Sequence, residues 1–587
     1  MHRTIWMLAG VVAGVTLLAA SATATTKVVG SSRGATLAAA PFAESWANVP
    51  RTSAGRKAKS VLVFGAEQDV AGFNVLNANQ SALWATIPGI TPTMHGAYII
   101  DNNGAYHLDA ASAVSANKTG LTITIRPDAY WYWGGKKLPV TNRDLVYTWQ
   151  QLVDPKNQVA SNTGYINIGS YKLKGTKTVT FLWHTSCPAG SEAAGTCAKG
   201  PFADYRDIFG EILPSKALAG LDFNTFWANC VCGNDGKPVS DGPFYLSNYT
   251  KGQGETLKVN PYWYGKKPLL KEVDFKIITD TNTEIQAMRG GEVDAIYPSP
   301  QVALSELKGQ SSLVYSSITA LGQEHWDINV AAPGNPLLRQ VWMRQAIAMG
   351  MNRVSLIQAL YGQIAPGLKP LNNVEFEVGV NAVPHFAKWA FAPKKALAVL
   401  KAHCTGGPSV PTRNNTSYWT CGGQKASFNF YTTAGNQRRQ TSAAIFAQQL
   451  GAIGIQLNVN FEPANPNFFG TRLPAHNFDI GEYAWSQGSP DPSGYDSIYT
   501  CGAGQNYKQY CNKQVDALIH SGDGDLNPKT RIASYEKAAS IMANEVAIIP
   551  LYSPPNILVH KTAVKGMQNS NNPTSEGPTW NVELWHW

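Results

Sequence analysis

Carboxylate and histidine side chains are the residues of this sequence that could carry out acid–base chemistry. Asp491 lies near both Glu482 and Asp496, and an acidic pair that faced one cleft could serve a secreted hydrolase. Histidines such as His325 and His476 stand alone, which is typical of buried or surface residues rather than of ligands. The sequence contains neither a Gly-x-x-x-x-Gly-Lys-Ser/Thr phosphate loop nor a His-Glu-x-x-His zinc helix. We therefore expect no enzymatic activity, no cofactor and no metal, and the hydrolase remains the alternative.

The cysteines favour an oxidising compartment, because all 8 of them lie beyond residue 24. Three pairs each bracket a short polar loop and are expected to form local disulfides: Cys187 with Cys197, Cys404 with Cys421, and Cys501 with Cys511. Cys230 and Cys232 could bond to each other only with strain, or they could cross to Cys187 and Cys197. A metal site is the alternative, but no histidine or second cysteine pair has the spacing that it needs.

Aromatic side chains are abundant, with 17 Trp, 24 Tyr and 20 Phe. Such residues line pockets that hold small ligands by stacking and apolar burial, while a few polar groups set the orientation. Aromatic residues also fill cores, so this composition is compatible with a ligand pocket without locating one.

The N-terminus has the pattern of a secretory signal. His2-Arg3 precedes an apolar run from Ile5 to Ala20, and the small residues Ser21 to Ala24 follow it. We expect residues 1–24 to be a signal segment cut after Ala24, with an uncleaved membrane anchor as the alternative. No cysteine stands at the expected cleavage site, so no lipid anchor is expected. Residues 25–58 are rich in Ala, Ser, Thr and Gly and are expected to form a flexible lead-in.

Length and charge narrow the class of protein further. A chain of 587 residues exceeds the size over which a single core usually grows, so two or more lobes are expected. The formal net charge of +9 is spread thinly, without a block of Lys and Arg. We therefore expect no nucleic-acid partner.

Hydrophobic periodicity predicts strands that alternate with helices, which indicates α/β lobes. Strands are expected at 60–65, 121–126, 273–278, 293–296 and 455–461, and helices at 141–152, 281–290, 335–349, 352–362, 442–453 and from 527 onward. Thr141 with Asp144 and Thr281 with Glu284 have the spacing of capping boxes. The segment from 60 to 240 has more strand and loop, which suggests a lobe of different character.

Short motifs follow one another in a fixed order along residues 60–566. They are Leu121–Arg126, Trp131–Leu138 and Val140–Tyr147; Gly242–Leu246, Asn260–Trp263 and Gly290–Asp294; Arg344–Met349 with Asn352-Arg353; and Gly451–Ile455, Phe478–Ile480 with Trp485, Pro490–Pro492, Cys511-Asn512 and Val515-Asp516. In this order they resemble the extracellular solute-binding proteins of the peptide/dipeptide/nickel class of ABC importers. Gly134-Gly135 stands where that family usually has Asp-Gly.

The resemblance implies an α/β, two-lobed periplasmic-binding-protein-like fold with an additional domain inserted in its N-terminal half. The expected division is 59–100 for the first part of lobe I, 101–204 for the inserted domain, 205–322 for the second part of lobe I, 323–544 for lobe II and 545–587 for the C-terminal part of lobe I. In this family the lobes close on the ligand by a hinge motion, which the ligand's contacts favour.

The resemblance also implies a ligand that lies extended and pairs with the protein backbone. The expected ligand-binding residues are Gln68, Asp69, Phe73, Asn74, Asn329, Tyr483, Ala484, Trp485, Ser486, Gln487 and Asp491. The expected partners are a short peptide or a similar small solute and the transmembrane subunits of an ABC permease. A monomer is expected, exported to the extracellular face of the membrane, the cell wall or the periplasm.

One position departs from the family pattern. Peptide-binding members usually have an Asp three residues after the Trp that corresponds to Trp485, and this Asp pairs with the ligand's amine. Gly488 stands at that position here. A buried ammonium without a partner is costly. Asp491, Asp69 or Glu67 could replace the missing carboxylate, or the ligand could be an oligosaccharide or another solute without a free amine.

Overall fold

Two mixed β-sheets organise the chain, and the segment between their first strands adds smaller sheets. The computed structural model describes residues 60–192, 195–374, 383–486, 491 and 495–587. All of them belong to one unit, residues 40–587. The expected signal segment and lead-in therefore lie outside the described residues.

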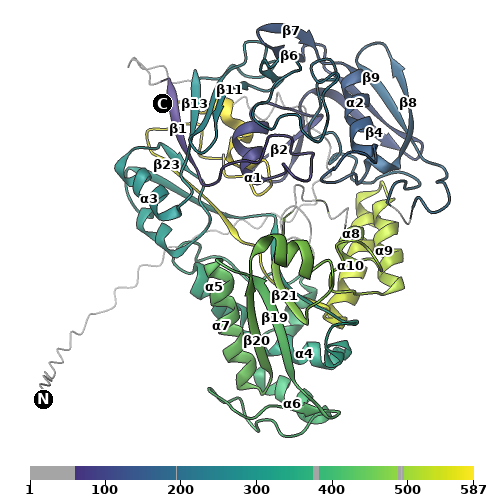
Figure 1. The fold of residues 1–587 in the computed structure, drawn as a ribbon, viewed down its shortest axis with the longest axis vertical. Helices are drawn as coiled ribbons and strands as arrows, with labels where there is room; N and C mark the ends of the chain where they lie inside the picture. The colour runs from purple at the N-terminus through teal and green to yellow at the C-terminus, as the bar shows by residue number, and fades with distance from the viewer. Residues whose placement is uncertain (1–59, 193–194, 375–382, 487–490, 492–494) are drawn as a thin grey trace, which may run out of the picture. The chain divides into compact units, whose positions relative to one another are not determined.

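The first sheet has seven strands in the order β11-β12-β13-β1-β14-β23-β15. Figure 1 labels β1, β11, β13 and β23 of this sheet. Their bounds are Val61–Ala66 for β1, Phe244–Thr250 for β11, Gly254–Val259 for β12, Glu272–Ile277 for β13, Ala295–Ile296 for β14, Leu313–Thr319 for β15 and Pro555–Lys561 for β23. β1 runs parallel to β13 and β14, and helix α3 (Thr281–Gly290) connects those two strands. The strands expected at 60–65, 273–278 and 293–296 are confirmed within one or two residues at their ends.

The second sheet has five strands in the order β20-β19-β21-β16-β22. Their bounds are Gly322–Ile328 for β16, Ser427–Thr433 for β19, Gln456–Glu462 for β20, Ile480–Ser486 for β21 and Ile548–Tyr552 for β22. β19 and β20 are parallel, and α7 (Gln437–Ala452) connects them as a crossover helix. Trp326 of β16 is fully buried between Phe430 and Phe446, which ties this sheet to α7.

The chain passes between the two sheets at two places that lie side by side. β15 leads into β16 through Ala320 and Leu321, and β22 leads into β23 through Ser553 and Pro554. The Ala320 N–H donates to the Pro554 carbonyl (2.9 Å), so the two connections are hydrogen-bonded to each other. The first crossing lies beside the expected boundary at 322/323, whereas β22, beyond residue 545, still pairs in the second sheet.

The segment between β1 and β11 forms three further sheets and helix α2 (Asn142–Val153). They comprise β2 (Tyr98–Ile100) with β3 (Tyr106–Leu108); β4 (Ala111–Asn117), β5 (Gly120–Ile125), β9 (Thr178–Trp183) and β8 (Ile168–Lys174); and β10 (Val239–Ser240), β6 (Tyr130–Trp133) and β7 (Lys136–Pro139). The expected capping box is present at the start of α2, where the Asp144 carboxylate accepts the Thr141 N–H at 2.8 Å.

The remaining regular elements lie mostly in the C-terminal half. They are α4 (Val341–Gly350), α5 (Arg353–Tyr361), α6 (Pro393–His403), α8 (Asp496–Tyr499), α9 (Lys513–Asp523) and α10 (Pro528–Glu545), with the short hairpin of β17 (Thr420–Cys421) and β18 (Gln424–Lys425) and the short helix α1 (Leu83–Ala85). The three expected local disulfides are present. Cys230 and Cys232 bond to each other, which decides between the two open pairings.

Three helix predictions need correction. Glu284 does not close a capping box: Asp280 caps α3 by accepting the Thr283 N–H (2.8 Å), and Glu284 points into the core. The helix expected from Asn335 is broken at Gln340, whose extended backbone separates a 3-10 turn from α4. Helix α7 begins at Gln437 rather than at residue 442, because Asn436 caps it there.

Candidate ligand-binding site

β16 and β21, the two central strands of the second sheet, carry different kinds of side chain on the two faces of the sheet. β16 and β21 are antiparallel, with Gln323 opposite Trp485 and His325 opposite Tyr483. Since side chains alternate along a strand, these four residues share one face of the sheet. Their neighbours in sequence, among them Glu324 and Glu482, share the other face.

The face that carries Glu324 and Glu482 is covered by α7. Arg439 of α7 forms an ion pair with Glu324 (2.6 Å), and Glu482 accepts hydrogen bonds from Trp326 Nε1 (2.8 Å) and Ser442 Oγ (2.9 Å). All of these side chains are buried. Glu482 is thus directed away from the opposite face, where the aromatic residues lie.

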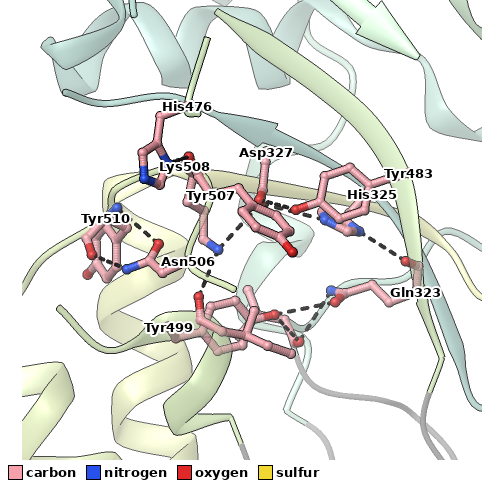
Figure 2. A network of polar contacts seen from close by, with 12 residues as sticks. Gln323, His325, Asp327, His476, Tyr483, Tyr499, Asn506, Tyr507, Lys508 and Tyr510 are labelled. Carbon is pink, nitrogen blue, oxygen red and sulfur yellow. Dashed lines mark hydrogen bonds and ion pairs between the residues drawn. The ribbon is translucent and has the colours of Figure 1, made fainter. Parts of the chain in front are cut away.

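The opposite face holds a buried ion pair beneath its aromatic rings (Figure 2). Lys508 Nζ lies 3.5 Å from Asp327 Oδ1, and the Tyr483 hydroxyl donates to Asp327 Oδ2. Lys508 also donates to the Ile498 carbonyl (3.1 Å) and lies 4.8 Å from the centre of the Tyr499 ring. Burial lowers the pKa of Lys508, and burial together with Asp327 raises the pKa of Tyr483. The pair fixes the segment that contains Tyr507 against the sheet.

His325 and Gln323 lie on the same face as the Asp327–Lys508 ion pair and form a polar layer with it. Neither side chain adds a charge to this layer. His325 Nδ1 lies 3.0 Å from the Gln323 carbonyl, which can only accept, so this nitrogen carries the proton. Burial lowers the pKa of His325, so the ring is neutral at neutral pH. The Gln323 amide and the Tyr499 hydroxyl both donate to the Val374 carbonyl (3.2 and 3.1 Å).

Half-buried aromatic rings lie above the polar layer, and we call them the aromatic layer: Tyr431, Phe469, Trp485 and Tyr507. All but Tyr431 contact the buried ring of Tyr483, at centroid distances of 5.4 to 6.3 Å. The Trp485 and Tyr507 rings stack at 6.1 Å with an interplanar angle of 17°. Trp485 Nε1 has no hydrogen-bond partner among the described residues. The layer therefore offers flat apolar surfaces, while Trp485 Nε1 itself is buried.

The edge of β21 beside this layer is open over most of its length. β19 pairs with β21 only at Ile480 and Gly481, whereas it pairs with β20 along its whole length. In the described part of the chain, no strand pairs with that edge of β21 beyond Gly481. At Glu482 the main-chain carbonyl accepts from the Thr432 hydroxyl of β19 (2.9 Å), so the open part of the edge begins after it. Main-chain groups at such an edge can pair with an added extended chain.

Asn329, one of the predicted binding residues, holds neighbouring loops together. Its side-chain amide donates to the carbonyls of His476 (2.8 Å) and Phe478 (3.1 Å). Its oxygen accepts from Gln509 Nε2 (3.0 Å) and the Ala331 N–H (3.2 Å). The side chain is fully buried, so in this structure Asn329 positions the loops around β21.

The predicted residues that follow β1 are mostly occupied by contacts within the protein. Asp69 accepts hydrogen bonds from the Tyr249 hydroxyl and the Gly252 N–H, both at 2.7 Å. Phe73 and Asn74 are fully buried, and the Asn74 amide donates to the Phe223 carbonyl (2.8 Å). Gln68, the fourth of these residues, is exposed.

The acidic candidates for an amine partner also have protein partners. Asp491 accepts from Arg531 Nη2 (2.5 Å), and Arg531 Nη1 donates to the Ala203 carbonyl (2.8 Å). Glu67 accepts from the Ser299 N–H (2.8 Å) and from Thr281 Oγ1. Gln487 and Gly488 lie outside the described residues, as does the side chain of Ser486.

The structure adds residues that the sequence did not single out. Tyr431, Phe469 and Tyr507 complete the aromatic layer, while Asp327 and Lys508 form the ion pair beneath it. The alternation in 427–433 could have placed Tyr431 on this face, but no local pattern brings Lys508 to Asp327. The described residues contain no group of three or more His, Cys, Asp or Glu side chains that could hold a metal ion. They also contain no helix that is long and apolar enough to cross a membrane.

Comparison of the sequence with known proteins gives a family match and distant relatives. Residues 106–507 match the model of the bacterial extracellular solute-binding proteins, family 5. The chain is 24% identical to oligopeptide-binding protein OppA of Mycobacterium tuberculosis over 508 residues, 84% of this chain and 79% of OppA. It is also 24% identical to oligopeptide-binding protein AppA of Bacillus subtilis over 379 residues, 64% of this chain and 65% of AppA.

Solved structures share the fold. A periplasmic EDTA-binding protein, EppA, superposes with a TM-score of 0.75 at 19% identity, over 90% of this chain and 96% of that one. AppA of Bacillus subtilis in complex with a nonapeptide superposes with a TM-score of 0.68 at 20% identity, over 90% of this chain and 99% of that one. The two-lobed α/β fold is therefore confirmed. Since the family model spans most of the chain, this protein belongs to the bacterial extracellular solute-binding proteins of family 5.

Proposed function

We propose that the protein is the solute-binding component of an ABC importer and captures short peptides for delivery to a membrane permease. The observation that carries the proposal is the open edge of β21 beside the aromatic layer. An extended peptide placed there would pair its main chain with β21 and lay its side chains against Trp485 and Tyr507. The matched relatives named as oligopeptide-binding proteins support this ligand class.

The same proposal includes export and a monomeric state. Residues 1–24 would direct the chain out of the cytoplasm, and the four disulfides suit an oxidising compartment. The placement of the candidate acids supports binding rather than catalysis. Glu482 lies on the α7 face of the sheet, and Asp491 is paired with Arg531.

An amine-free solute is the second candidate, and the occupied carboxylates favour it. Asp69, Asp491 and Glu67 each accept hydrogen bonds from the protein. A ligand ammonium would therefore have to compete with these partners for a carboxylate. A neutral oligosaccharide would stack on the same rings and would need no carboxylate. The solved EDTA-binding protein shows that the fold also serves a protein named for a non-peptide solute.

Calorimetric titration with matched peptides tests both candidates. A library of tri- to pentapeptides is titrated with free and with acetylated N-termini, and neutral oligosaccharides are titrated in parallel. Binding of free peptides that Trp485→Ala weakens at least about tenfold would support the proposal. The matched control is Tyr171→Ala, which removes an exposed ring of β8 and should leave the affinity unchanged. Tighter binding of acetylated peptides, or of oligosaccharides alone, would favour the amine-free solute.

A further inference from the structure

A hollow lies at the hairpin of β6 and β7, and none of its lining residues belongs to the aromatic layer. Figure 1 shows the place of this hairpin in the fold. The volume of the hollow is about 90 Å³, and its walls come from the hairpin, the start of α2 and the segment 214–217. The register pairs Trp131 with Leu138 and Trp133 with Val239, so these four side chains share one face of the small sheet. That face forms the apolar wall of the hollow.

The wall contains one carboxylate, Asp144, and its oxygens accept hydrogen bonds from neighbouring residues. Asp144 is buried and accepts from the N–H (2.9 Å) and hydroxyl (2.6 Å) of Ser215, the Thr141 N–H (2.8 Å) and Trp131 Nε1 (3.4 Å). Its charge is thus satisfied by donors from three segments. The interior of the hollow therefore presents apolar surface to an occupant.

The rim of the hollow is basic. Arg143 and Lys216 line it and are exposed. Lys136 Nζ lies 5.9 Å from the centre of the Trp133 ring, and the stem of Lys237 lies against Gly134 in the hairpin turn. None of these four cations forms an ion pair within 4 Å in the part of the chain that the structure describes. Asp235 is an exposed carboxylate nearby, and it accepts from Trp133 Nε1 at 2.7 Å.

We propose that this hollow, which we call the hairpin pocket, docks an acidic protein segment that inserts one leucine-sized side chain. About 90 Å³ is too small for a whole solute, which needs several hundred Å³, but it suits a single anchor residue. Carboxylates that flank the anchor would meet Arg143, Lys216 and Lys136, which form no ion pair with the residues that the structure describes. The concave shape favours an inserted side chain over a flat bilayer. Residues 130–139 expose no large hydrophobic side chain that could enter a membrane.

Fluorescence anisotropy of a short probe tests the proposal. The probe is fluorescein-labelled Asp-Glu-Leu-Asp-Glu with both ends blocked, titrated with the full exported protein at low salt. We expect saturable binding that Arg143→Glu/Lys216→Glu weakens at least about tenfold, because two rim cations become anions. Lys172→Glu/Lys174→Glu, which reverses two exposed cations of β8, is the matched control and should change the affinity less than about twofold. Replacing the probe's Leu by Gly should weaken binding at least about fivefold.

Trp485→Ala separates the hairpin pocket from the proposed solute site, because the probe should bind this variant as it binds the parent. Loss of probe binding in Trp485→Ala would place the probe in the solute site and overturn the inference. The inference would also be overturned if Arg143→Glu/Lys216→Glu and Lys172→Glu/Lys174→Glu weakened probe binding equally. Equal affinity for the Leu and the Gly probe would overturn it as well. Absence of probe binding would overturn it too. Binding to phosphatidylglycerol vesicles is measured as well. If Arg143→Glu/Lys216→Glu abolished vesicle binding but left probe binding unchanged, the basic rim would be assigned to a membrane surface instead.

Discussion

The two halves of the predicted binding site differ in how their side chains are used. After β1, Phe73 and Asn74 are packed in the core, and Asp69 is engaged by Tyr249. On the second sheet, Trp485 is half-buried, keeps an unpartnered N–H among the described residues and borders an open strand edge. The family resemblance implied ligand contacts in both halves, so it does not distinguish residues that build the site from residues that face it. We expect the ligand's binding energy to come mainly from the β21 half.

The largest expected effect is on the support beneath the aromatic layer. Asp327→Ala leaves the Lys508 ammonium buried without its counter-ion, and should lower the free energy of unfolding by about 3–5 kcal/mol. Urea unfolding at neutral pH measures this. The double variant Asp327→Ala/Lys508→Met should recover most of the loss. A cost below about 1 kcal/mol for the single variant would show that the pair does not support the layer.

The next prediction compares one variant from each half of the predicted binding site. Trp485→Ala removes a half-exposed ring and should weaken peptide binding by about 1.5–3 kcal/mol while changing the stability little. Phe73→Ala empties a core position and should cost about 3–5 kcal/mol of stability with an unchanged dissociation constant for the fraction that folds. Calorimetric titration and urea unfolding are measured on both. The reverse pattern would move the centre of the site to the β1 half.

Two buried histidines should respond to pH in opposite ways. Burial by itself would lower the pKa of either ring. For His95, the ion pair with Asp109 and the nearby carboxylates of Asp241 and Glu583 outweigh burial, and the pKa is raised to about 9. The pKa of His325 is lowered. The stability that protonated His95 contributes is fully present below pH 6.5 and is lost as the pH rises toward 9.

Urea unfolding between pH 6.5 and 9 tests this contrast. The protein should lose stability across this range, His95→Gln should reduce the slope, and His325→Gln should leave it in place. An unchanged slope in His95→Gln would mean that His95 is not held protonated by its carboxylates.

The smallest expected effect concerns the amine partner. Asp69→Asn should change the affinity for free peptides by less than about twofold, because Tyr249 and Gly252 already occupy the carboxylate. Titration with free and acetylated peptides measures it. A loss of tenfold or more that is confined to free peptides would identify Asp69 as the group that replaces the carboxylate missing at Gly488.

The sequence predicted the local elements well and the contacts between distant segments poorly. A short apolar run located β1, hydrophobic alternation located β5 and β20, and the Asn527-Pro528 cap located the start of α10. The break at Gln340 and the burial of Glu284 depend on packing that no local signal encodes. The same holds for the site: the family motif located Trp485, whereas Lys508 meets Asp327 only because the segment around it folds over the sheet.

Hydrogen–deuterium exchange of the protein with and without a tri- to pentapeptide mixture tests the central claim most directly. If the open edge of β21 pairs with the ligand's main chain, amides between Glu482 and Ser486 should exchange more slowly when peptide is bound, and Trp485→Ala should remove most of this protection at the same peptide concentration. Peptide binding that leaves the exchange of Ile480–Ser486 unchanged would contradict the account, and so would protection confined to the segment after β1.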